Sequence, residues 1–317
     1  MKALVLGSDD RFTLATAEAP TPGPGEVAIR VRYAGLQWGD VLVANGQLPM
    51  PRPFVPGFEA AGDIVAVGEG VDAARIGRPV TALTASGAFA EFVTAPDVLA
   101  FPAEGLDPRT AAAFGWAAPT AYDLINTVTR VRPGDRVLIH AALGGVGSLA
   151  AQFAGAAGAG RVVGVGGDGG AEHADYAAGL GYDHLIPRAD FPDALADERY
   201  DVILDPVGGP ARLAHLDRLA PHGRLAVYGN MATFEPVRLN ANDLLMNGTS
   251  VLAYNSNLLS RTHPERLAAA AAEALRLLAD ERIRIDISAE YELADVPTAL
   301  QRLAAGGTRG RTVIRIA

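Results

Sequence analysis

The chain has 317 residues, of which 49% are apolar and 20% are charged, a mix typical of soluble proteins and sufficient for two hydrophobic cores. Its formal net charge of −9, with no basic stretch, disfavours binding to nucleic acid or to an anionic membrane surface. The lack of cysteine excludes disulfides, thiolate catalysis, iron–sulfur clusters and cysteine-bound zinc.

The beginning of the chain carries no targeting signal. The run Met1–Gly7 is too short for a signal peptide and is followed at once by Asp9 and Asp10. No stretch approaches the roughly 18 apolar residues that a membrane span requires. We therefore expect a cytoplasmic protein with no membrane partner.

The first part of the chain, to about Pro108, has the pattern of short strands broken by turns. Residues 27–33 alternate between apolar and polar positions, as a half-buried strand does. Apolar runs at 61–68, 77–82 and 88–93 continue the pattern. These segments predict a small, irregular β-barrel.

From Ala111 onward, apolar strands alternate with helical segments at intervals of about 20–25 residues, which is typical of βαβ units in a doubly wound parallel sheet. A helix is then expected at 264–279, and a last strand at 312–316 that returns to the first domain. The expected strands of the sheet are 136–141, 161–165, 184–186, 201–205, 224–228 and 250–254, and its helices are 145–157, 172–179 and 211–219.

The motif richest in chemical information lies between the strand 136–141 and the helix that follows it. Ala142, Gly144 and Gly147 occupy the three small-residue positions of G-x-G-x-x-G, with Ala at the first. Small residues there permit a tight turn, a close approach of the backbone to a pyrophosphate, and close packing of helix on strand. The helix start adds N–H groups that point at the anion. We expect a dinucleotide to bind at Ala142, Gly144, Gly145, Val146 and Gly147 rather than an ordinary glycine-rich turn.

The end of the second strand of this sheet bears on the choice of cofactor. An NAD site usually carries an acidic residue there for the ribose 2′-OH, whereas this strand ends at Gly166 and Gly167. This favours NADPH over NADH, although Asp168 lies only one residue beyond Gly167. His173 and Arg188 are the candidate partners of the 2′-phosphate, and for each the alternative is an ordinary surface residue.

Later strand ends supply the other candidate cofactor contacts, because the carboxyl ends of parallel strands form the binding edge of such a sheet. The backbone at Val207 is expected to line the site, and Asp205 either contributes there or caps its turn. Tyr228, Gly229 and Asn255 lie at strand ends where the nicotinamide and ribose would bind. His140, inside a buried strand, is expected to be a hydrogen-bonded core residue.

The sequence resembles the medium-chain dehydrogenase/reductases, specifically the zinc-free branch of quinone oxidoreductases and enoyl reductases. Individually the matching segments are short, but they occur in order over nearly the whole chain. They are 22–27, 34–36, 39–40, 55–62, 67–68, 77–80, 88–92, 119–122, 141–147, 205–209 and 310–313.

The resemblance implies an α/β protein of two domains: a GroES-like β-barrel catalytic domain formed by residues 1–118 and 257–317, and a Rossmann dinucleotide-binding domain formed by 119–256. It also implies that hydride passes between NADPH and a small-molecule substrate in the cleft between the domains. A homodimer is implied as well, in which the strand near Val251 pairs with its copy. Because the cofactor supplies the hydride, the protein is expected to contribute mainly orientation of the reactants and electrostatic stabilisation.

The resemblance also bears on zinc and on the catalytic residues. Zinc-binding members use Cys, His and Glu ligands, but this chain has no cysteine and carries Phe58 where they carry His, so no zinc is expected and Glu59 is expected to be structural. Gln37 replaces the usual Asn near the nicotinamide, and Leu48 replaces a Tyr that has been proposed as proton donor. The residues expected at the reacting centre are Gln37, Asp40 in an orienting role, and Thr120.

Three functions remain open from the sequence. The first is NADPH-dependent reduction of a quinone, enone or other activated alkene. The second is a pathway-specific enoyl reductase that tailors a polyketide or other secondary metabolite. The third is a cofactor-binding protein of the same fold with little catalytic activity.

Overall fold

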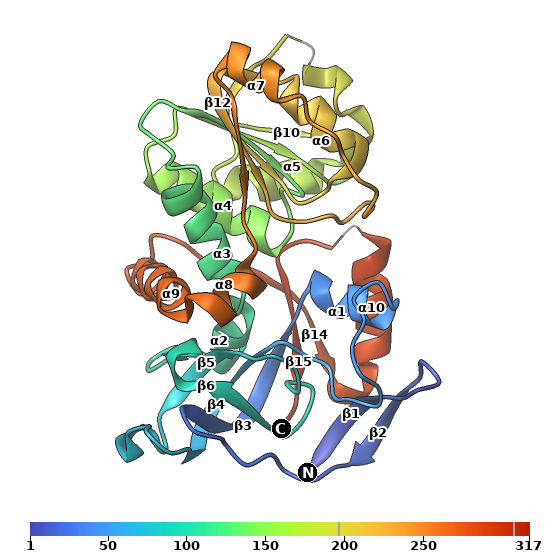
Figure 1. Ribbon diagram of the computed structural model, residues 1–317, viewed down its shortest axis with the longest axis vertical. Coiled ribbons are helices and arrows are strands. Elements are labelled where there is room, and N and C mark those ends of the chain that lie inside the picture. Colours follow the sequence, from blue (N-terminus) through green and yellow to red (C-terminus); the bar gives the residue numbers. More distant parts are fainter. Residues whose placement is uncertain (196, 307) are drawn as a thin grey trace. The chain divides into compact units, whose positions relative to one another are not determined.

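The computed structural model describes residues 1–195, 197–306 and 308–317. Its contacts divide the chain into two compact units (Figure 1). The barrel unit comprises 1–117, 260–272 and 285–317, and the sheet unit comprises 118–259 and 273–284. The predicted division places residue 118, residues 257–259 and residues 273–284 in the first domain, and the two divisions differ at these positions. Within the described residues, no helix is both long and apolar enough to cross a membrane.

The barrel unit is built on a mixed sheet in the order β14-β15-β3-β4-β5-β7, with β6 paired to the first half of β3. The predicted return of the last strand is confirmed, since β15 pairs antiparallel with the second half of β3 and sets Thr312 opposite Leu36. The strands are β1 (Lys2–Leu6), β2 (Phe12–Thr16), β3 (Glu26–Leu36), β4 (Glu59–Val67), β5 (Pro79–Leu83), β6 (Phe92–Pro96), β7 (Ala100–Pro102), β14 (Ile287–Glu292) and β15 (Arg311–Arg315), and the helices are α1 (Trp38–Ala44), α2 (Pro108–Phe114) and α10 (Val296–Ala305).

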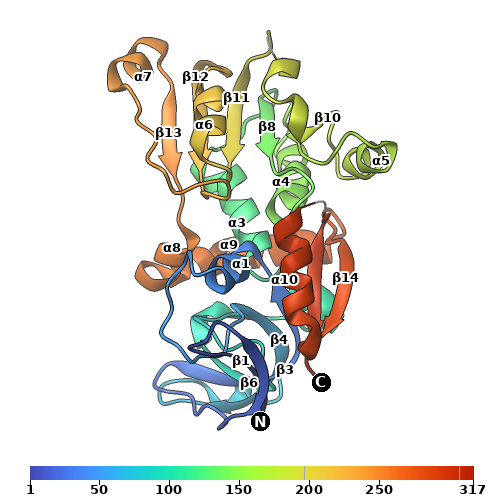
Figure 2. The same ribbon diagram turned by 90° about the vertical axis from the view of Figure 1, so that its right-hand side faces the viewer.

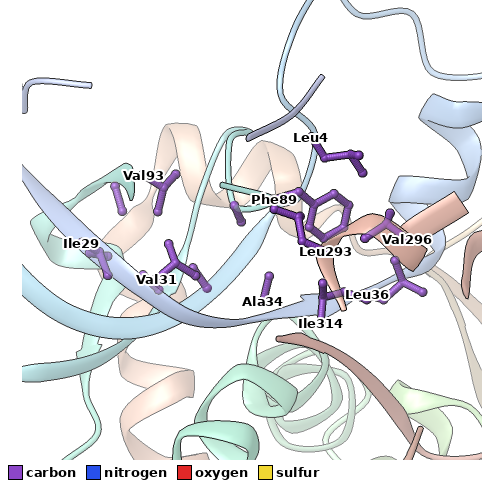
Figure 3. Packing of buried hydrophobic residues seen from close by; sticks show 14 of the residues in the cluster. Leu4, Ile29, Val31, Ala34, Leu36, Phe89, Val93, Leu293, Val296 and Ile314 are labelled. Atoms are coloured by element: carbon purple, nitrogen blue, oxygen red, sulfur yellow. The ribbon is translucent and has the colours of Figure 1, made fainter. Parts of the chain in front are cut away.

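The core of the barrel unit joins residues from both ends of the chain (Figure 3). Leu4 and Phe89 share one cluster with Leu293 and Val296. The prediction of a strand over 88–93 was wrong in its bounds, because β6 begins only at Phe92 and ends at Pro96. Phe89 is fully buried, and its carbonyl accepts from the Leu4 N–H at 2.9 Å. The segment before β6 therefore turns into the core as a loop rather than alternating as a strand.

The sheet unit contains the predicted doubly wound parallel sheet, in the order β10-β9-β8-β11-β12-β13 (Figure 2). Numbered from β8, this is the 3-2-1-4-5-6 order of two mononucleotide-binding halves. Helix α4 packs on β8 and β9, and α6 packs on β11 and β12. The strands are β8 (Arg136–His140), β9 (Arg161–Val165), β10 (His184–Ile186), β11 (Tyr200–Asp205), β12 (Leu219–Val227) and β13 (Ser250–Ala253), and the helices are α4 (Gly145–Ala156), α5 (Ala171–Gly179), α6 (Gly209–Leu216) and α7 (Ala241–Asn247).

Helices α3 (Ala117–Asp123), α8 (Ser256–Thr262) and α9 (Pro264–Ala279) each begin in one unit and end in the other. The helix predicted at 264–279 is confirmed to the residue as α9. Its alanine-rich interior is consistent with this, because alanine has the highest helix propensity.

Within the barrel unit, a buried ion pair joins a strand from the N-terminal part of the chain to the last strand. Glu59 on β4 is fully buried, and one carboxylate oxygen is paired with the guanidinium of Arg311 at the start of β15. The other accepts from the Trp116 N–H at 2.6 Å, while Arg311 Nε donates to the Ala113 carbonyl at 2.9 Å. A Cβ at Gly115 would lie 1.7 Å from a Glu59 oxygen, so glycine is required there. The structural role expected for Glu59 is the one that these contacts describe.

We predict that Arg311→Met lowers the free energy of unfolding by about 3–5 kcal/mol, because it leaves the Glu59 charge buried and unpaired. The double variant Glu59→Gln/Arg311→Met should recover part of this loss, since no charge then remains buried. Denaturant unfolding followed by tryptophan fluorescence measures both. Arg276→Met, which removes an exposed ion pair to Asp280, is the control and should change stability by less than about 1 kcal/mol. An unchanged midpoint for Arg311→Met would contradict the assignment.

Candidate dinucleotide-binding site

The turn from β8 into α4 forms an open helix N-terminus. Ala141 adopts a left-handed conformation with φ of 56°, which is uncommon for a residue with a side chain. Gly144 is the N-cap of α4 and makes no side-chain cap hydrogen bond. The first intrahelical bond runs from the Ser148 N–H to the Gly144 carbonyl at 2.9 Å. The backbone N–H groups of the first turn therefore have no capping side chain and can bind an anion.

The glycine positions of this turn differ in what fills the space around them. A Cβ at Gly147 would lie 2.4 Å from the Ala141 carbonyl oxygen and 2.7 Å from that of Ala142, so the close approach of helix to strand requires glycine. A Cβ at Gly144 would meet only the Ala141 oxygen, at 3.3 Å. Since protein atoms do not crowd Gly144, its small size leaves room for a ligand. Both roles agree with the motif.

The hydroxyl of a buried tyrosine, Tyr182, contacts backbone carbonyls of this turn. The sequence did not predict Tyr182 as a site residue. The Tyr182 hydroxyl lies 3.1 Å from the Ala142 carbonyl oxygen and 2.9 Å from the Gly147 carbonyl oxygen, so its one O–H is within donating distance of both acceptors. Burial raises the pKa of this hydroxyl well above its ordinary value, so it remains a donor. A Cβ at Gly164 on β9 would come within 3.0 Å of the Tyr182 ring. Tyr182 lies just before β10, the strand next to β9, and nothing in the local sequence marks it as buried.

The residues expected at the 2′-phosphate gather around the end of β9. A Cβ at Gly166 would lie 3.3 Å from the Ala142 nitrogen, which brings this strand end against the glycine turn. His173 Nδ1 lies 2.8 Å from Asp168 Oδ1, and the Arg188 N–H donates to the Gly167 carbonyl at 3.3 Å. The hydrogen bonds that Asp168 accepts, from the Gly170 backbone and from His173, lower its pKa. The exposed carboxylate of Asp168, the His173 ring and the Arg188 backbone thus share this corner of the sheet.

The strand ends of the other half of the sheet form a second group. Asp205, the last residue of β11, caps its own turn, because Oδ1 accepts from the Val207 N–H at 2.8 Å and from the Gly208 N–H at 3.0 Å. The Tyr228 N–H donates to the Asp205 carbonyl at 3.1 Å. A Cβ at Gly229 would lie 2.6 Å from the Pro206 carbonyl oxygen. Val207, Tyr228 and Gly229 are therefore brought together on adjacent loops.

Asn255 and His140 have local partners. Asn255 Oδ1 accepts from the Leu258 N–H at 2.9 Å, so its side-chain oxygen caps the start of α8. His140 is a buried, hydrogen-bonded core residue as predicted: its Nδ1 lies 3.0 Å from His215 Nε2, and burial lowers its pKa to about 3. The neutral form of His140 therefore persists at physiological pH.

The residues expected at the reacting centre are divided between the units. Gln37 and Asp40 lie in the barrel unit, where Gln37 is the N-cap of α1 and its N–H donates to Asp40 Oδ2 at 3.0 Å. Asp40 is 1% exposed, and burial, with the charge of Glu59 nearby, raises its pKa to about 8. Thr120 is buried on α3 in the sheet unit.

The donors needed for a zinc site are not brought together. Within residues 1–195, 197–306 and 308–317, no three side chains of His, Cys, Asp or Glu form a cluster that could hold a metal ion. The oxygens of Glu59 bind Arg311 and the Trp116 N–H. Beside it stands Phe58, which has no donor atom in its side chain.

Two family models match the chain: the alcohol dehydrogenase GroES-like domain over residues 23–105 and the zinc-binding dehydrogenase model over residues 180–314. A mycobacterial protein solved in complex with NADPH is 30% identical, with 99% of each chain covered and a TM-score of 0.89. A quinone oxidoreductase of Pseudomonas syringae is 29% identical, with 99% of this chain and 100% of that chain covered and a TM-score of 0.87. This chain belongs to the quinone oxidoreductase branch of the medium-chain dehydrogenase/reductase superfamily. The family consists of oxidoreductases, and the predicted combination of a GroES-like domain with a Rossmann sheet is confirmed.

Other relatives broaden the range of functions to consider. A mycocerosic acid synthase-like polyketide synthase of Mycolicibacterium smegmatis is 32% identical over 98% of this chain, which spans only 15% of that protein's length. The human synaptic vesicle membrane protein VAT-1 homolog is 33% identical over 72% of this chain and 61% of its own length. A thermostable alcohol dehydrogenase of Pyrobaculum aerophilum with bound cobalt and zinc is 27% identical, with 99% of each chain covered and a TM-score of 0.85.

We predict that Tyr182→Phe loosens the glycine turn without unfolding the sheet. Loss of the hydroxyl leaves the carbonyls of Ala142 and Gly147 without this donor in a buried site, a cost of about 1–3 kcal/mol. Hydrogen exchange of the Ala142, Gly144 and Ser148 amides, which are hydrogen-bonded at the turn, should become at least about fivefold faster if that cost falls on local opening. Tyr200→Phe is the matched control, since it removes a buried tyrosine hydroxyl, bonded to Glu198, at the start of β11. Equal exchange at the turn in both variants would refute the role of Tyr182.

Proposed function

We propose that this chain is an NADPH-dependent, zinc-independent reductase that transfers hydride to a quinone, an enone or another activated alkene. The observation that carries the proposal is the uncapped start of α4, where Gly144 leaves room for a pyrophosphate against the first-turn N–H groups and Gly147 allows the helix to pack closely on the strand. Similarity to an NADPH-bound mycobacterial protein and to quinone oxidoreductases supports the cofactor and the reaction class.

The residues of the sheet unit fit this cofactor. Gly144, Gly147 and the first turn of α4 would hold the pyrophosphate through the N–H groups of Gly145 and Val146. His173 and Arg188 would hold the 2′-phosphate, with Asp168 engaged by His173 rather than left as a free carboxylate. The loops that carry Val207, Tyr228, Gly229 and Asn255 would line the nicotinamide half.

In this proposal the bound NADPH supplies the hydride, and the residues of this chain stabilise the charge that develops on the acceptor. Reduction of a quinone consumes one hydride and one proton and yields the hydroquinone, so the oxyanion formed on hydride arrival needs a donor until it is protonated. The Gln37 amide is our candidate donor. Asp40 holds Gln37 through its backbone N–H, and Thr120 is assigned to the nicotinamide environment. The single proton is assigned to solvent.

Zinc independence is proposed from the donor set and not from any lack of metal in the structure. The chain offers no cysteine, Phe58 replaces a ligand position, and the Glu59 oxygens are occupied by Arg311 and Trp116. A metal Lewis acid would have no site at this position, so the amide of Gln37 would take its place. Treatment with a chelator is accordingly expected to leave activity unchanged.

A second candidate is supported by the polyketide synthase relatives, which match 98% of this chain. In that case the acceptor is an α,β-unsaturated thioester, and hydride addition gives an enolate that needs the same donor and one proton. The chemistry on the protein side is unchanged. Only the acceptor distinguishes the two candidates.

We predict that the protein binds NADPH more tightly than NADH, as measured by titration of cofactor fluorescence. Gly147→Ala should abolish binding, because its Cβ would collide with the Ala141 and Ala142 carbonyls. Gly155→Ala, in the same helix with no atom within 4 Å of the added Cβ, should bind normally and gain about 0.5–1 kcal/mol of stability. If the wild type binds neither cofactor, the proposal fails.

The same samples then test the reaction through a panel of quinones, enones and enoyl thioesters. Oxidation of NADPH by quinones or enones supports the first candidate, and oxidation by enoyl thioesters alone supports the second. Tight binding with no oxidation by any of them would favour the cofactor-binding protein with little catalysis. A chelator-treated sample serves as the metal control.

We also propose a homodimer formed through β13. This strand is an edge of the six-stranded sheet and its outer side is unpaired within the unit, and an exposed edge can pair with a second copy. We predict a particle of twice the 32.8 kDa chain mass in light scattering. Val251→Pro removes a backbone donor from the strand and should shift the particle toward the monomer. A wild-type monomer at micromolar concentration would contradict the proposal.

A further inference from the structure

Arg212 on α6 is held in an unusual position for a charged residue. Its side chain is 11% exposed and its Nε donates to Asp205 Oδ2 at 2.7 Å. Its Nη2 donates to the Gly229 carbonyl at 2.7 Å and its Nη1 to Asn230 Oδ1 at 3.2 Å. One guanidinium therefore joins the end of β11 to the loop after β12.

The two segments that Arg212 joins also contact each other directly. The Met231 N–H donates to the Pro206 carbonyl at 3.0 Å, and the Ala232 N–H donates to the Val207 carbonyl at 2.9 Å. On the β11 side, Asp205 in turn fixes Val207 and the following glycine through its other oxygen. Arg212 thus acts on the loop after β11 through Asp205, and it contacts the loop after β12 directly.

These loops lie at the carboxyl ends of β11 and β12, in the second mononucleotide half of the sheet. In a sheet of this order the half that contains β8 and the glycine turn binds the adenosine side, and the half that contains β11 and β12 receives the other nucleotide. Arg212 reaches neither the glycine turn nor the Asp168 corner by any hydrogen bond or ion pair among the described residues. Its influence should therefore be confined to the nicotinamide half.

Stability alone accounts poorly for this arrangement. A buried ion pair contributes little net stability, because the desolvation of both charges offsets their attraction. What a guanidinium adds is geometry, since its planar donors fix several acceptors in one arrangement at once. A point charge of the same sign could pair with Asp205 but could not hold Gly229 and Asn230 together in the same way.

We propose that Arg212 is a positioning residue that holds the loops 206–208 and 228–232 in the arrangement that receives the nicotinamide half of the dinucleotide. The inference rests on the proposed function, because it assumes that the sheet unit binds NADPH. It assigns to Arg212 a role in how the reactive end of the cofactor is seated. Retention of the adenosine end is left to the glycine turn and the end of β9.

The test compares two ligands on purified full-length protein: NADPH, and 2′,5′-ADP, which contains only the adenosine half with its 2′-phosphate. Arg212→Met should weaken NADPH binding about tenfold or more, because hydrogen bonds from a charged donor are lost, and should leave 2′,5′-ADP binding within about twofold. The shift in NADPH fluorescence on binding, which reports the surroundings of the nicotinamide ring, should also diminish.

Two further variants separate positioning from folding. Arg212→Lys keeps the charge beside Asp205 and should retain the wild-type unfolding midpoint more closely than Arg212→Met, yet still show the selective loss of NADPH affinity. Leu213→Met changes the next residue of the same helix, which is 47% exposed, and should alter neither ligand.

The outcomes distinguish this inference from the function on which it rests. Wild-type protein that binds neither ligand would overturn both. Wild-type protein that binds both, with Arg212→Met weakening them equally or neither of them, would leave the proposed function standing and overturn the role of Arg212. Full NADPH affinity in Arg212→Lys would show that charge alone suffices and would likewise overturn it.

Discussion

The barrel unit depends on the ion pair between Glu59 and Arg311, which lie 252 residues apart in the chain. A domain assembled from both ends of a chain has to close a very long loop, and the entropy of that closure grows only slowly with length. The greater difficulty is specificity, because a last strand could pair in more than one register. Glu59 admits one arrangement, in which its oxygens meet Arg311 and the Trp116 N–H while Gly115 leaves the necessary space. The cost of burying both charges is offset by this unique set of contacts.

The same principle applies in the sheet unit with different chemistry. Apolar side chains such as Leu138 and Ile203 belong to the hydrophobic core of the sheet unit. They do not determine the conformation of the loops at the strand ends. Polar groups buried beneath the loops do so: Tyr182 lies under the glycine turn, and Asp205 with Arg212 lies under the loops of β11 and β12. Because an unpaired polar group in such a place is costly, each loop is restricted to the conformation that satisfies its partner. Rigid loops are what an enzyme needs when its cofactor carries the reactive atom.

The sequence was sufficient for the elements whose signals are local. Buried strands such as β8 and β9, the helix α9, and the strand–turn–helix context of the glycine motif follow from periodicity and small-residue spacing. The helices α1 and α10 and the strand β14 were not predicted, since segments of 7, 10 and 6 residues are marginal by themselves and their stability comes from packing within the barrel unit. The error at Phe89 has a related cause. A run of apolar residues resembles a strand whether it pairs at a sheet or turns into a core, and only tertiary contacts decide between these.

The site was predictable to the extent that it consists of backbone. Gly144 and Gly147 could be identified because glycine at these motif positions indicates that another group approaches the backbone closely. Tyr182 and Arg212 could not, because a tyrosine and an arginine are common at surfaces and nothing near them in the sequence shows that they are buried. Their roles arise from pairings across the sheet: Tyr182 with Ala142, Arg212 with Asp205 and Gly229.

The corner at Asp168 shows why electrostatics has to be considered at the level of individual contacts. A carboxylate near the end of β9 would ordinarily favour a ribose 2′-OH and repel a 2′-phosphate. Here its charge is opposed by His173 at 2.8 Å and by the Gly170 N–H at 3.1 Å, and both contacts stabilise the ionised form of Asp168. The carboxylate thereby orients the His173 ring through Nδ1. In the proposed function, an acidic residue that would count against NADPH by its position alone is compatible with it, because its charge is already engaged by His173 and by the Gly170 N–H.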